Sequence, residues 1–252
     1  MKKIITIANQ KGGVGKTTTA VNLSAALSIL NRKILLIDID PQGNATSGLG
    51  IDKNSISKSI YELLLGKIKI EEVILKTSLE NLDIIPSNNE LNGAQIELLE
   101  FEDKNYILKD NISAIIEKYD FIIIDCPPSL GILTLNALTA SNSVIIALQT
   151  EYYALEGLTE LMKTIELVKK NLNKEINIEG ILLTMFDVRT NISYEVEEEV
   201  RNFYKDLVFK TVIPRNVKLS EAPSYGKSII EYDITSKGAL AYISLAKEVI
   251  KE

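Results

Sequence analysis

The first thirty residues constrain the fold of this chain more than any other stretch. An apolar run at residues 3–8 predicts a buried strand, and the pattern of residues 16–30 predicts a helix. The loop between them contains Gly12, Gly13 and Gly15. Glycine permits positive φ and lets backbone N–H groups approach a ligand closely, and the start of a helix attracts anions. A buried strand, a glycine loop and a helix in this order predict a phosphate-binding loop in an α/β fold.

Residues 15–17 of this loop read Gly-Lys-Thr, the core of the P-loop motif. In that motif the lysine (here Lys16) bridges the β- and γ-phosphates, and the threonine hydroxyl (here Thr17) is a ligand of Mg²⁺. A glycine turn with incidental lysines is the alternative, but strand, spacing and helix all agree with the motif. The candidate phosphate-binding residues are Lys11, Gly12, Gly13, Val14, Gly15, Lys16, Thr17 and Thr18.

One position departs from the general motif. The first glycine of the pattern falls on Gln10, and an additional lysine, Lys11, follows it directly. From the residues alone, Lys11 is either a solvated loop lysine or a second cation that neutralises charge on the transferring phosphoryl group.

Strand-like apolar segments alternate with helical patterns along the chain. We expect strands at residues 3–8, 33–39, 82–86, 121–125, 143–149, 178–185 and 208–213. We expect helices at residues 16–30, 59–65, 90–100, 104–118, 133–140, 155–171, 194–205 and 237–251. This alternation predicts an α/β fold with a doubly wound, mostly parallel twisted sheet flanked by helices. We expect one domain over residues 1–252, with an irregular excursion at residues 50–80 on one edge.

The composition narrows the chemistry available to the chain. It contains no histidine, which excludes an imidazole base, a Ser-His-Asp triad and the usual zinc sites. Its single cysteine, Cys126, excludes an internal disulfide and is interpreted as a buried small residue. No apolar run approaches the ~18 residues of a membrane span, so we expect a cytoplasmic protein. The net charge of −6 argues against a uniformly basic surface but not against a local basic face.

Carboxylates stand at the ends of two expected strands. Asp38 and Asp40 follow the apolar residues of the second strand, and Asp125 ends the strand at 121–125. In an open parallel sheet such positions face the crevice where ligands bind. Asp40 is the candidate that orients the attacking water or accepts its proton, while Asp38 is interpreted as structural or as a helper. Asp125 is the candidate that holds Mg²⁺ or a Mg²⁺-bound water. For each of the three, the alternative is a strand-end carboxylate with a purely structural role.

Several segments together resemble the ParA/MinD family of ATPases, and in particular its Soj-like chromosome-partitioning members. The segments are KGGVGKTT, DPQGNATSGLG, IIIDCPPSLG, NALTAS, EYYALEGL, LLTMFDVRTN and TVIPRNVKLSEAPSYGKSI, so the resemblance covers nearly the whole chain. It implies a slow ATP hydrolase that uses ATP and Mg²⁺. It also implies that Lys11 reaches the ATP of a partner subunit in an ATP-dependent homodimer. The implied catalytic residues are Lys11, Lys16 and Asp40, and the implied metal-site residues are Thr17, Asp40 and Asp125.

The same resemblance assigns residues near the C-terminal end of the chain. Pro214 and Asn216 match the segment that packs against the adenine. Arg189 and Lys218 match DNA-contacting basic residues, although position 218 is commonly arginine in the family. Residues 200–228 carry six basic side chains against two acidic ones, which on composition alone is equally typical of a solvated face. The resemblance implies non-specific binding of double-stranded DNA, association with the nucleoid, and release by a centromere-binding partner of the ParB type that stimulates hydrolysis.

Other interpretations stay open at this point. An acidic run at Glu195, Glu197, Glu198 and Glu199 is interpreted as a solvated helix face, with a basic peptide of a partner as the alternative. A MinD-like membrane-associated ATPase in division-site placement is the alternative function. The segment GALAYISLAKEVIKE lacks the basic amphipathic pattern of a membrane anchor, so we expect no membrane partner. An iron–sulfur carrier would need more cysteines, and a small-molecule kinase or ligase would release ADP in response to a metabolite without DNA.

Overall fold

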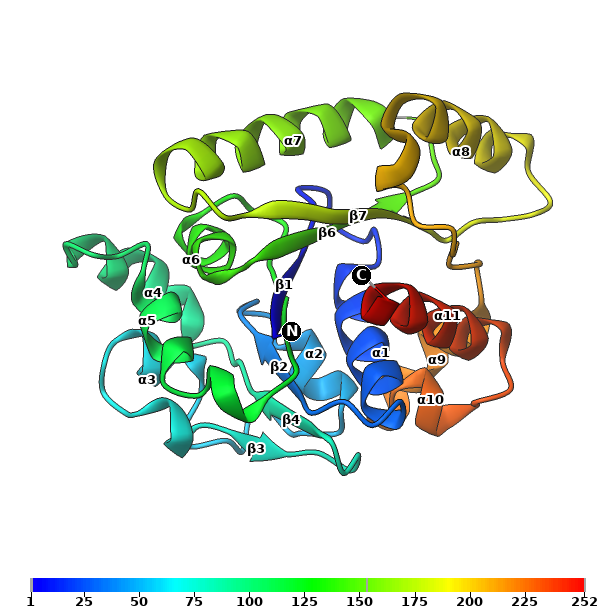
Figure 1. Ribbon diagram of the computed structural model, residues 1–252. Helices are drawn as coiled ribbons and strands as arrows, with labels where there is room; N and C mark the ends of the chain where they lie inside the picture. The colour runs from blue at the N-terminus through cyan, green and yellow to red at the C-terminus, as the bar shows by residue number, and fades with distance from the viewer. Residues whose placement is uncertain (1, 153, 252) are drawn as a thin grey trace.

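A seven-stranded sheet organises the chain, which a computed structural model describes at residues 2–152 and 154–251. The strand order is β3-β4-β2-β5-β1-β6-β7 (Figure 1). The strands are β1 (Lys3–Ala8), β2 (Ile34–Asp38), β3 (Leu75–Lys76), β4 (Leu82–Ile85), β5 (Phe121–Asp125), β6 (Ser143–Gln149) and β7 (Asn177–Thr184). All neighbouring strands pair in parallel except β3 and β4, which are antiparallel. The predicted doubly wound, mostly parallel sheet is confirmed.

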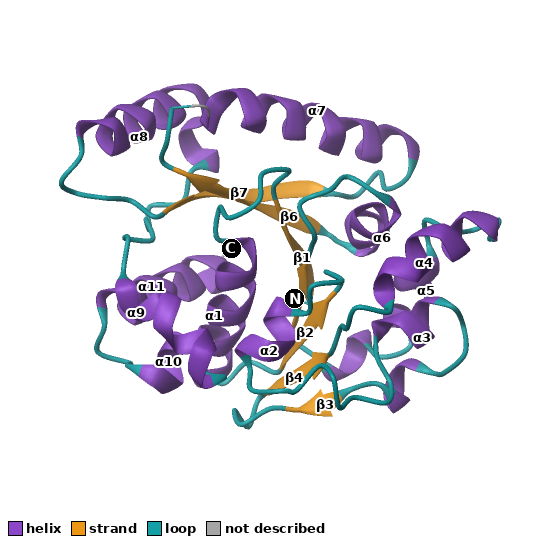
Figure 2. Ribbon diagram, turned by 180° about the vertical axis from the view of Figure 1, so that it is seen from behind, coloured by secondary structure: helices purple, strands orange, loops and turns teal. Residues whose placement is uncertain are grey.

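Helices cover both faces of the sheet because successive strand residues point to opposite sides. The helices are α1 (Lys16–Ile29), α2 (Asn44–Gly48), α3 (Ile60–Leu64), α4 (Leu91–Glu97), α5 (Ile107–Ser113), α6 (Ile132–Ala140), α7 (Ala154–Asn171), α8 (Asn191–Tyr204), α9 (Val217–Glu221), α10 (Ile229–Tyr232) and α11 (Lys237–Lys251). On β1, Ile5 and Ile7 join the core under α1 and α11, whereas Ile4 joins the core under α3 to α6. The helices α7 and α8 cover β6 and β7 on the second face (Figure 2).

Six of the seven expected strands are present with ends shifted by at most one or two residues, and the seventh expectation was wrong. Residues 208–213 run beside β7 with one isolated bridge, between Val208 and Ile181, and with hydrogen bonds from the Phe209 and Ile213 amides to β7 at 3.0 and 2.9 Å. The amides of Lys210 and Thr211 donate to the Glu248 carboxylate of α11, at 2.9 and 2.8 Å, instead of continuing a ladder. The Glu248 carboxylate therefore interrupts the pairing with β7 between Phe209 and Ile213, and no continuous strand forms.

Two of the expected helices are interrupted in the structure. The helices expected at 90–100 and 104–118 each break into an α-helix and a 3₁₀ turn, at Leu98–Glu100 and Ile116–Lys118. The stretch 50–80 contains α3 and supplies β3, the antiparallel edge strand. Within the described residues, no helix has the length and hydropathy needed to cross a bilayer.

A glycine in β7 gives a test of this packing. The pairing of β6 and β7 shifts register at Gly180, and a Cβ at that position would lie 2.5 Å from the ring of the buried Phe209. We expect Gly180→Ala to lower the free energy of unfolding by about 1–3 kcal/mol, because the ring must move within a packed core. Urea unfolding followed by circular dichroism measures the change.

Gly157→Ala in α7 is the matched control, since no atom beyond the nearby backbone of α7 itself lies within 4 Å of the added methyl group. We expect this change to raise the free energy of unfolding by roughly 0.5–1 kcal/mol, because alanine is the better helix former. Equal effects of the two substitutions would contradict the packing of residues 208–213 against β7.

Candidate functional site

The glycine loop between β1 and α1 is held in shape by neighbouring elements. Gly13 and Gly15 have positive φ angles of 76° and 90°, a conformation that glycine adopts without strain. The hydroxyl of Thr184, at the end of β7, donates to the carbonyl of Val14 at 2.8 Å. The loop therefore has a defined conformation, with α1 beginning at Lys16 directly after it.

Lys16 is a buried ammonium group with few protein acceptors. Its residue is 6% exposed, and Nζ donates to the backbone carbonyl of Lys11 at 2.9 Å. Burial lowers the pKa of Lys16 below its ordinary value, while the charges of Asp125 and Asp40 act in the opposite direction. A buried cation at the start of a helix is favourable only with an anion nearby, which makes this position suited to a phosphate group.

Asp125 is completely buried, and neither of its carboxylate oxygens has a hydrogen-bond partner among the described residues. Burial raises the pKa of Asp125 well above its ordinary value, and the charge of Asp38 raises it further, whereas Thr17 and Lys16 oppose the rise. An unpaired buried carboxylate is unfavourable unless something else satisfies it. A carboxylate and a threonine hydroxyl are donors of the hard oxygen type that Mg²⁺ prefers, so these residues fit a divalent cation.

Asp38 holds the turn that follows β2. It pairs in register with Asp125 across the β2–β5 ladder. Its carboxylate accepts bonds from the Thr46 N–H at 2.8 Å, the Thr46 hydroxyl at 2.7 Å and the Asp40 N–H at 3.2 Å. Burial raises the pKa of Asp38 to about 6, although these hydrogen bonds oppose the rise. The geometry agrees with the structural interpretation of Asp38.

Asp40 lies at the wall of a cavity of about 310 Å³ in front of the glycine loop. Its residue is 7% exposed, and its Oδ1 accepts the Gln42 N–H at 2.9 Å. Of the residues predicted from the sequence, the cavity is lined by Gly12, Gly13, Gly15, Lys16, Thr17, Thr18 and Asp40. The structure therefore places the candidate phosphate, metal and water-orienting groups together, with Asp125 buried beside Lys16.

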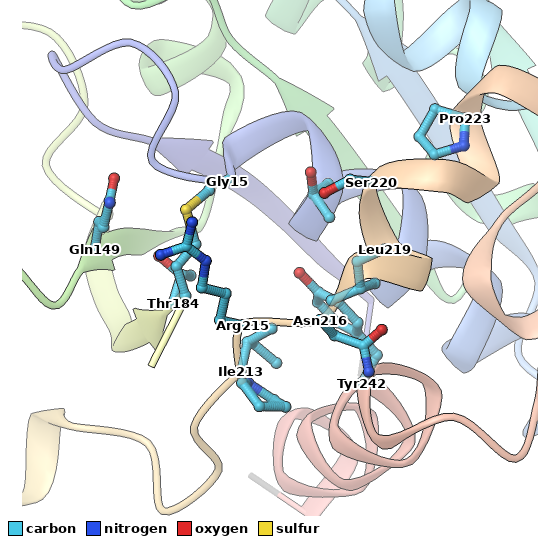
Figure 3. A pocket seen from close by; sticks show the side chains of 13 residues that line it. Gly15, Gln149, Thr184, Ile213, Arg215, Asn216, Leu219, Ser220, Pro223 and Tyr242 are labelled. Carbon is cyan, nitrogen blue, oxygen red and sulfur yellow. The ribbon is translucent and has the colours of Figure 1, made fainter. Parts of the chain in front are cut away.

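A second cavity, of about 480 Å³, adjoins the first at Gly15 and Thr18. Pro214 and Asn216 line it, as do side chains from the ends of β6 and β7 (Figure 3). The Asn216 Oδ1 accepts the Lys218 N–H at 2.9 Å and caps α9, so only the amide NH₂ of this residue is left to donate to a ligand. The position of this cavity beside the glycine loop suits the base of a nucleotide.

Sequence reasoning missed Gln149, Thr184 and Met185, which line the second cavity. Gln149 and Thr184 end β6 and β7, and the rule that strand ends face the ligand crevice of a parallel sheet could have found them. Met185 lines both cavities and has a φ of 52°, which costs free energy for a residue other than glycine. No sequence pattern signals that conformation.

Lys11 is not among the residues that line the first cavity. Its N–H donates to Asn9 Oδ1 at 2.9 Å, while its ammonium group forms an ion pair with Glu151, just beyond the end of β6. The Lys11 side chain is 53% exposed. Within one subunit, therefore, the two lysines of the loop have different environments: the Lys16 side chain points into the site, and the Lys11 side chain lies at the surface.

The two candidate DNA contacts are exposed, and each has an acidic neighbour. Arg189 makes a two-point ion pair with Asp187, with N–O distances of 2.8 and 2.6 Å, and Lys218 pairs with Asp233. The hydrogen bond from Arg189 lowers the pKa of Asp187 far below its ordinary value. In the described part of the chain no hydrogen bond or ion pair joins Arg189 to Lys218. Their basic charge is thus partly compensated in the isolated subunit.

Comparisons with known proteins agree on one family. A family model described as an AAA domain matches residues 2–178. The chain is 57% identical over 249 residues to the sporulation initiation inhibitor protein Soj of Bacillus subtilis (strain 168), covering 99% of this chain and 98% of that protein. It is 55% identical over 249 residues to the chromosome partitioning protein ParA of Myxococcus xanthus (strain DK1622), covering 99% and 88%. A solved structure of cobyrinic acid a,c-diamide synthase from Mycobacterium smegmatis, with a bound ATP analogue and magnesium, matches with a TM-score of 0.88 and 37% identity over 100% of this chain and 95% of that one.

The buried state of Asp125 gives a test in the protein without nucleotide. Because its pKa is raised on folding, Asp125 keeps a proton that the unfolded chain loses above about pH 4. Its contribution to stability is therefore complete at low pH and is lost as the pH rises through the raised pKa. We expect Asp125→Asn to gain stability relative to the wild type as the pH increases from 4 to 8, as measured by urea unfolding.

The chain has no histidine, but Asp38, whose pKa burial raises to about 6, also titrates in this range in both proteins. Asp206→Asn, at an exposed position after α8, is the control for the loss of a carboxylate at the surface. A constant difference between the wild type and Asp125→Asn across the range would rule out the proposed burial of an ionisable Asp125.

Proposed function

The chain belongs to the ParA/Soj family of partitioning ATPases, and we propose that it is a Mg²⁺-dependent ATP hydrolase that acts as a nucleotide switch in chromosome or plasmid partitioning. One observation carries the proposal. The Lys16 ammonium lines the cavity in front of the glycine loop, and the unpartnered Asp125 carboxylate is buried behind that lining, close enough to Lys16 for their charges to interact. Neither group is satisfied by the protein alone, and a magnesium–triphosphate ligand would satisfy both.

Each residue of the site has a role in this proposal. The N–H groups of the loop and the Lys16 ammonium bind the phosphates, and Pro214 and Asn216 contact the adenine in the larger cavity. Thr17 and Asp125 hold Mg²⁺, directly or through water, and the metal supplies neutralisation of phosphate charge when it is bound. Asp40 lies at the wall of the same cavity and orients the attacking water or accepts its proton.

Lys11 acts across a dimer interface in this proposal. Its ion pair with Glu151 is half-exposed, and such pairs contribute only about 0–1 kcal/mol. The triphosphate of a second subunit carries far more negative charge, so exchange of Glu151 for that ligand is favourable. ATP would thereby join two subunits, and hydrolysis would separate them.

We propose that the ATP-bound dimer binds double-stranded DNA of the nucleoid without sequence preference, through Arg189 and Lys218. We also propose that a ParB-type partner stimulates ATP hydrolysis and thereby releases the protein from this DNA. The pairs with Asp187 and Asp233 weaken each contact in a single subunit. Dimerisation doubles the number of phosphate contacts on one ligand, so affinity rises steeply in the ATP state. We also propose that residues 1–252 form one domain, because helices from both ends of the chain, α1 and α11, pack on the same face of one sheet.

Two other functions are less well supported. A MinD-like membrane switch requires a free amphipathic helix, whereas the apolar residues of α11 pack into the core beside α1. A small-molecule ligase is compatible with the likeness to the mycobacterial synthase at 37% identity, but the identity to the partitioning proteins is higher, at 55–57%.

The two lysines should separate nucleotide binding from dimerisation. We expect Lys16→Ala to weaken ATP binding by at least ~30-fold, because it removes the buried ammonium group that would pair with the phosphates. We expect Lys11→Ala to keep ATP affinity within about 3-fold of the wild type but to lose the ATP-dependent dimer. Fluorescent-nucleotide titration and analytical ultracentrifugation measure the two effects. If Lys16→Ala retained its affinity for ATP, the loop would be misassigned; if Lys11→Ala still dimerised, Lys11 would not act in trans.

Co-sedimentation with DNA tests the switch itself. We expect DNA retention with a slowly hydrolysed ATP analogue and none with ADP. Arg189→Glu should reduce retention about 10-fold and flatten its salt dependence, while leaving basal ATP hydrolysis unchanged. Arg32→Glu, an exposed arginine before β2, is the control and should behave as the wild type. Equal DNA retention with ADP and with the analogue would refute the switch.

A further inference from the structure

The end of α4 and the 3₁₀ turn after it expose large apolar side chains. Ile96, Leu99 and Phe101 are 74%, 56% and 41% exposed, while Leu98 between them is fully buried. Ile96 and Leu99 are three positions apart and therefore lie on one side of the helical segment. Figures 1 and 2 both show α4 and this turn extending outward at the edge of the molecule, away from β6 and β7. An exposed apolar surface of this kind is typical of a binding site.

Acidic residues surround these apolar side chains. The stretch 90–103 contains five acidic residues and no basic one: Glu90, Glu97, Glu100, Glu102 and Asp103. Among the described residues none of the five forms an ion pair within the chain. Lys104, the next residue in the sequence, has its ammonium group directed to the carbonyl of Leu99, at 3.4 Å. We call Ile96, Leu99, Phe101 and these five carboxylates the α4 surface.

The charge of the α4 surface identifies the chemistry of its occupant. A second copy of the chain would bring the same five carboxylates against each other in a symmetric contact, which is electrostatically unfavourable. A basic amphipathic segment instead supplies apolar side chains for Ile96 and Leu99 and ammonium or guanidinium groups for the carboxylates around them. The surface is therefore complementary to a basic, amphipathic segment of another protein.

The α4 surface is connected to both loops that carry the candidate carboxylates. Ser87, just before α4, donates its hydroxyl to the carbonyl of Asp40 at 2.7 Å. The Gln95 side chain in α4 packs on Gly131, where a Cβ would lie 3.5 Å from Gln95 Oε1. Gly131 ends the loop that begins after Asp125 and leads into α6. These two contacts connect α4 and the residues before it to the Asp40 backbone and to the loop after Asp125.

We propose that the α4 surface is the docking site for a basic amphipathic segment of the partner that stimulates hydrolysis. The inference rests on the proposed function in one respect, since it takes a hydrolysis-stimulating partner from it. Binding of the segment at Ile96 and Leu99 moves α4, and the contacts of Ser87 and Gln95 pass that movement to the groups around the phosphates.

Matched variants test the α4 surface with a purified ParB-type protein as the probe. The apolar variant is Ile96→Ser with Leu99→Ser, and the charge variant is Glu100→Lys with Glu102→Lys. The controls are Leu167→Ser on α7, 61% exposed, and Glu195→Lys with Glu198→Lys on α8. Affinity is measured by fluorescence anisotropy, and ATP turnover is measured with and without the partner.

We expect each α4 variant to bind the partner at least 10-fold more weakly and to lose most of the stimulation, while basal turnover and ATP affinity stay at wild-type values. The controls should stay within about 2-fold of the wild type in every measurement. Wild-type affinity and stimulation in the α4 variants would overturn the inference, and so would an equal loss in the controls. Loss of the ATP-dependent dimer in the α4 variants would also overturn it, because a second copy would then occupy the surface.

A wrong assignment of the partner in the proposed function would give a different experimental result. If the ParB-type protein stimulates neither the wild type nor any variant, the proposed partner is wrong. In that case a synthetic helix of leucine and lysine in amphipathic order becomes the probe. Weaker binding of this helix to the α4 variants than to the controls would support the surface, and equal binding would overturn it.

Discussion

The burial of Lys16, Asp38 and Asp125 at the ends of neighbouring elements is the constraint on which the rest of the site depends. Asp38 is satisfied by Thr46 and by the Asp40 backbone, but Asp125 has no hydrogen-bond partner in the described chain and Lys16 bonds a single carbonyl. Such an arrangement is unfavourable by itself. Apolar strands packed on both faces hold these groups in place, so the folded sheet maintains buried charges that the proposed magnesium–nucleotide ligand would satisfy. Ligand binding should therefore stabilise the whole protein and not only the loop.

Much of this architecture could be predicted from local sequence patterns. The six parallel strands β1, β2, β4, β5, β6 and β7 each coincide with a short, mainly apolar run. The glycine loop is a motif whose residues each have a physical reason. Residues 208–213 look like another such strand, yet their amides bond a carboxylate from α11 that is thirty-seven or thirty-eight positions away in the chain. Periodicity within a segment contains no information about a distant acceptor, so this error was unavoidable from pattern alone.

A site residue was predictable where its own segment of sequence shows both the reactive group and its position in the fold. Lys16, Thr17 and Asp40 lie at one cavity because a motif or a strand end positions each of them. The partners of Lys11 and Lys218 were not predictable, because Glu151 and Asp233 become their neighbours only in the folded structure, whereas Asp187 stands two residues before Arg189 in the sequence. These ion pairs give the isolated subunit a surface that differs from what its basic residues suggest. The charge that a ligand or a second subunit meets is set by these pairs as much as by the lysines and arginines themselves.

The hydrogen bonds that Glu248 accepts from the amides of Lys210 and Thr211 connect α11 to the surroundings of the larger cavity. The same C-terminal helix that carries Glu248 also carries Tyr242, which lines that cavity and whose hydroxyl lies 3.2 Å from the hydroxyl of Thr19 in α1. Pro214 follows the anchored segment by three residues. Direct contacts thus join α11 to the segment that leads to Pro214 and to α1, both of which adjoin the cavity. Occupancy of the cavity should slow amide hydrogen exchange along α11, including at residues that touch no ligand, so the C-terminal helix would report on ligand binding from outside the pocket.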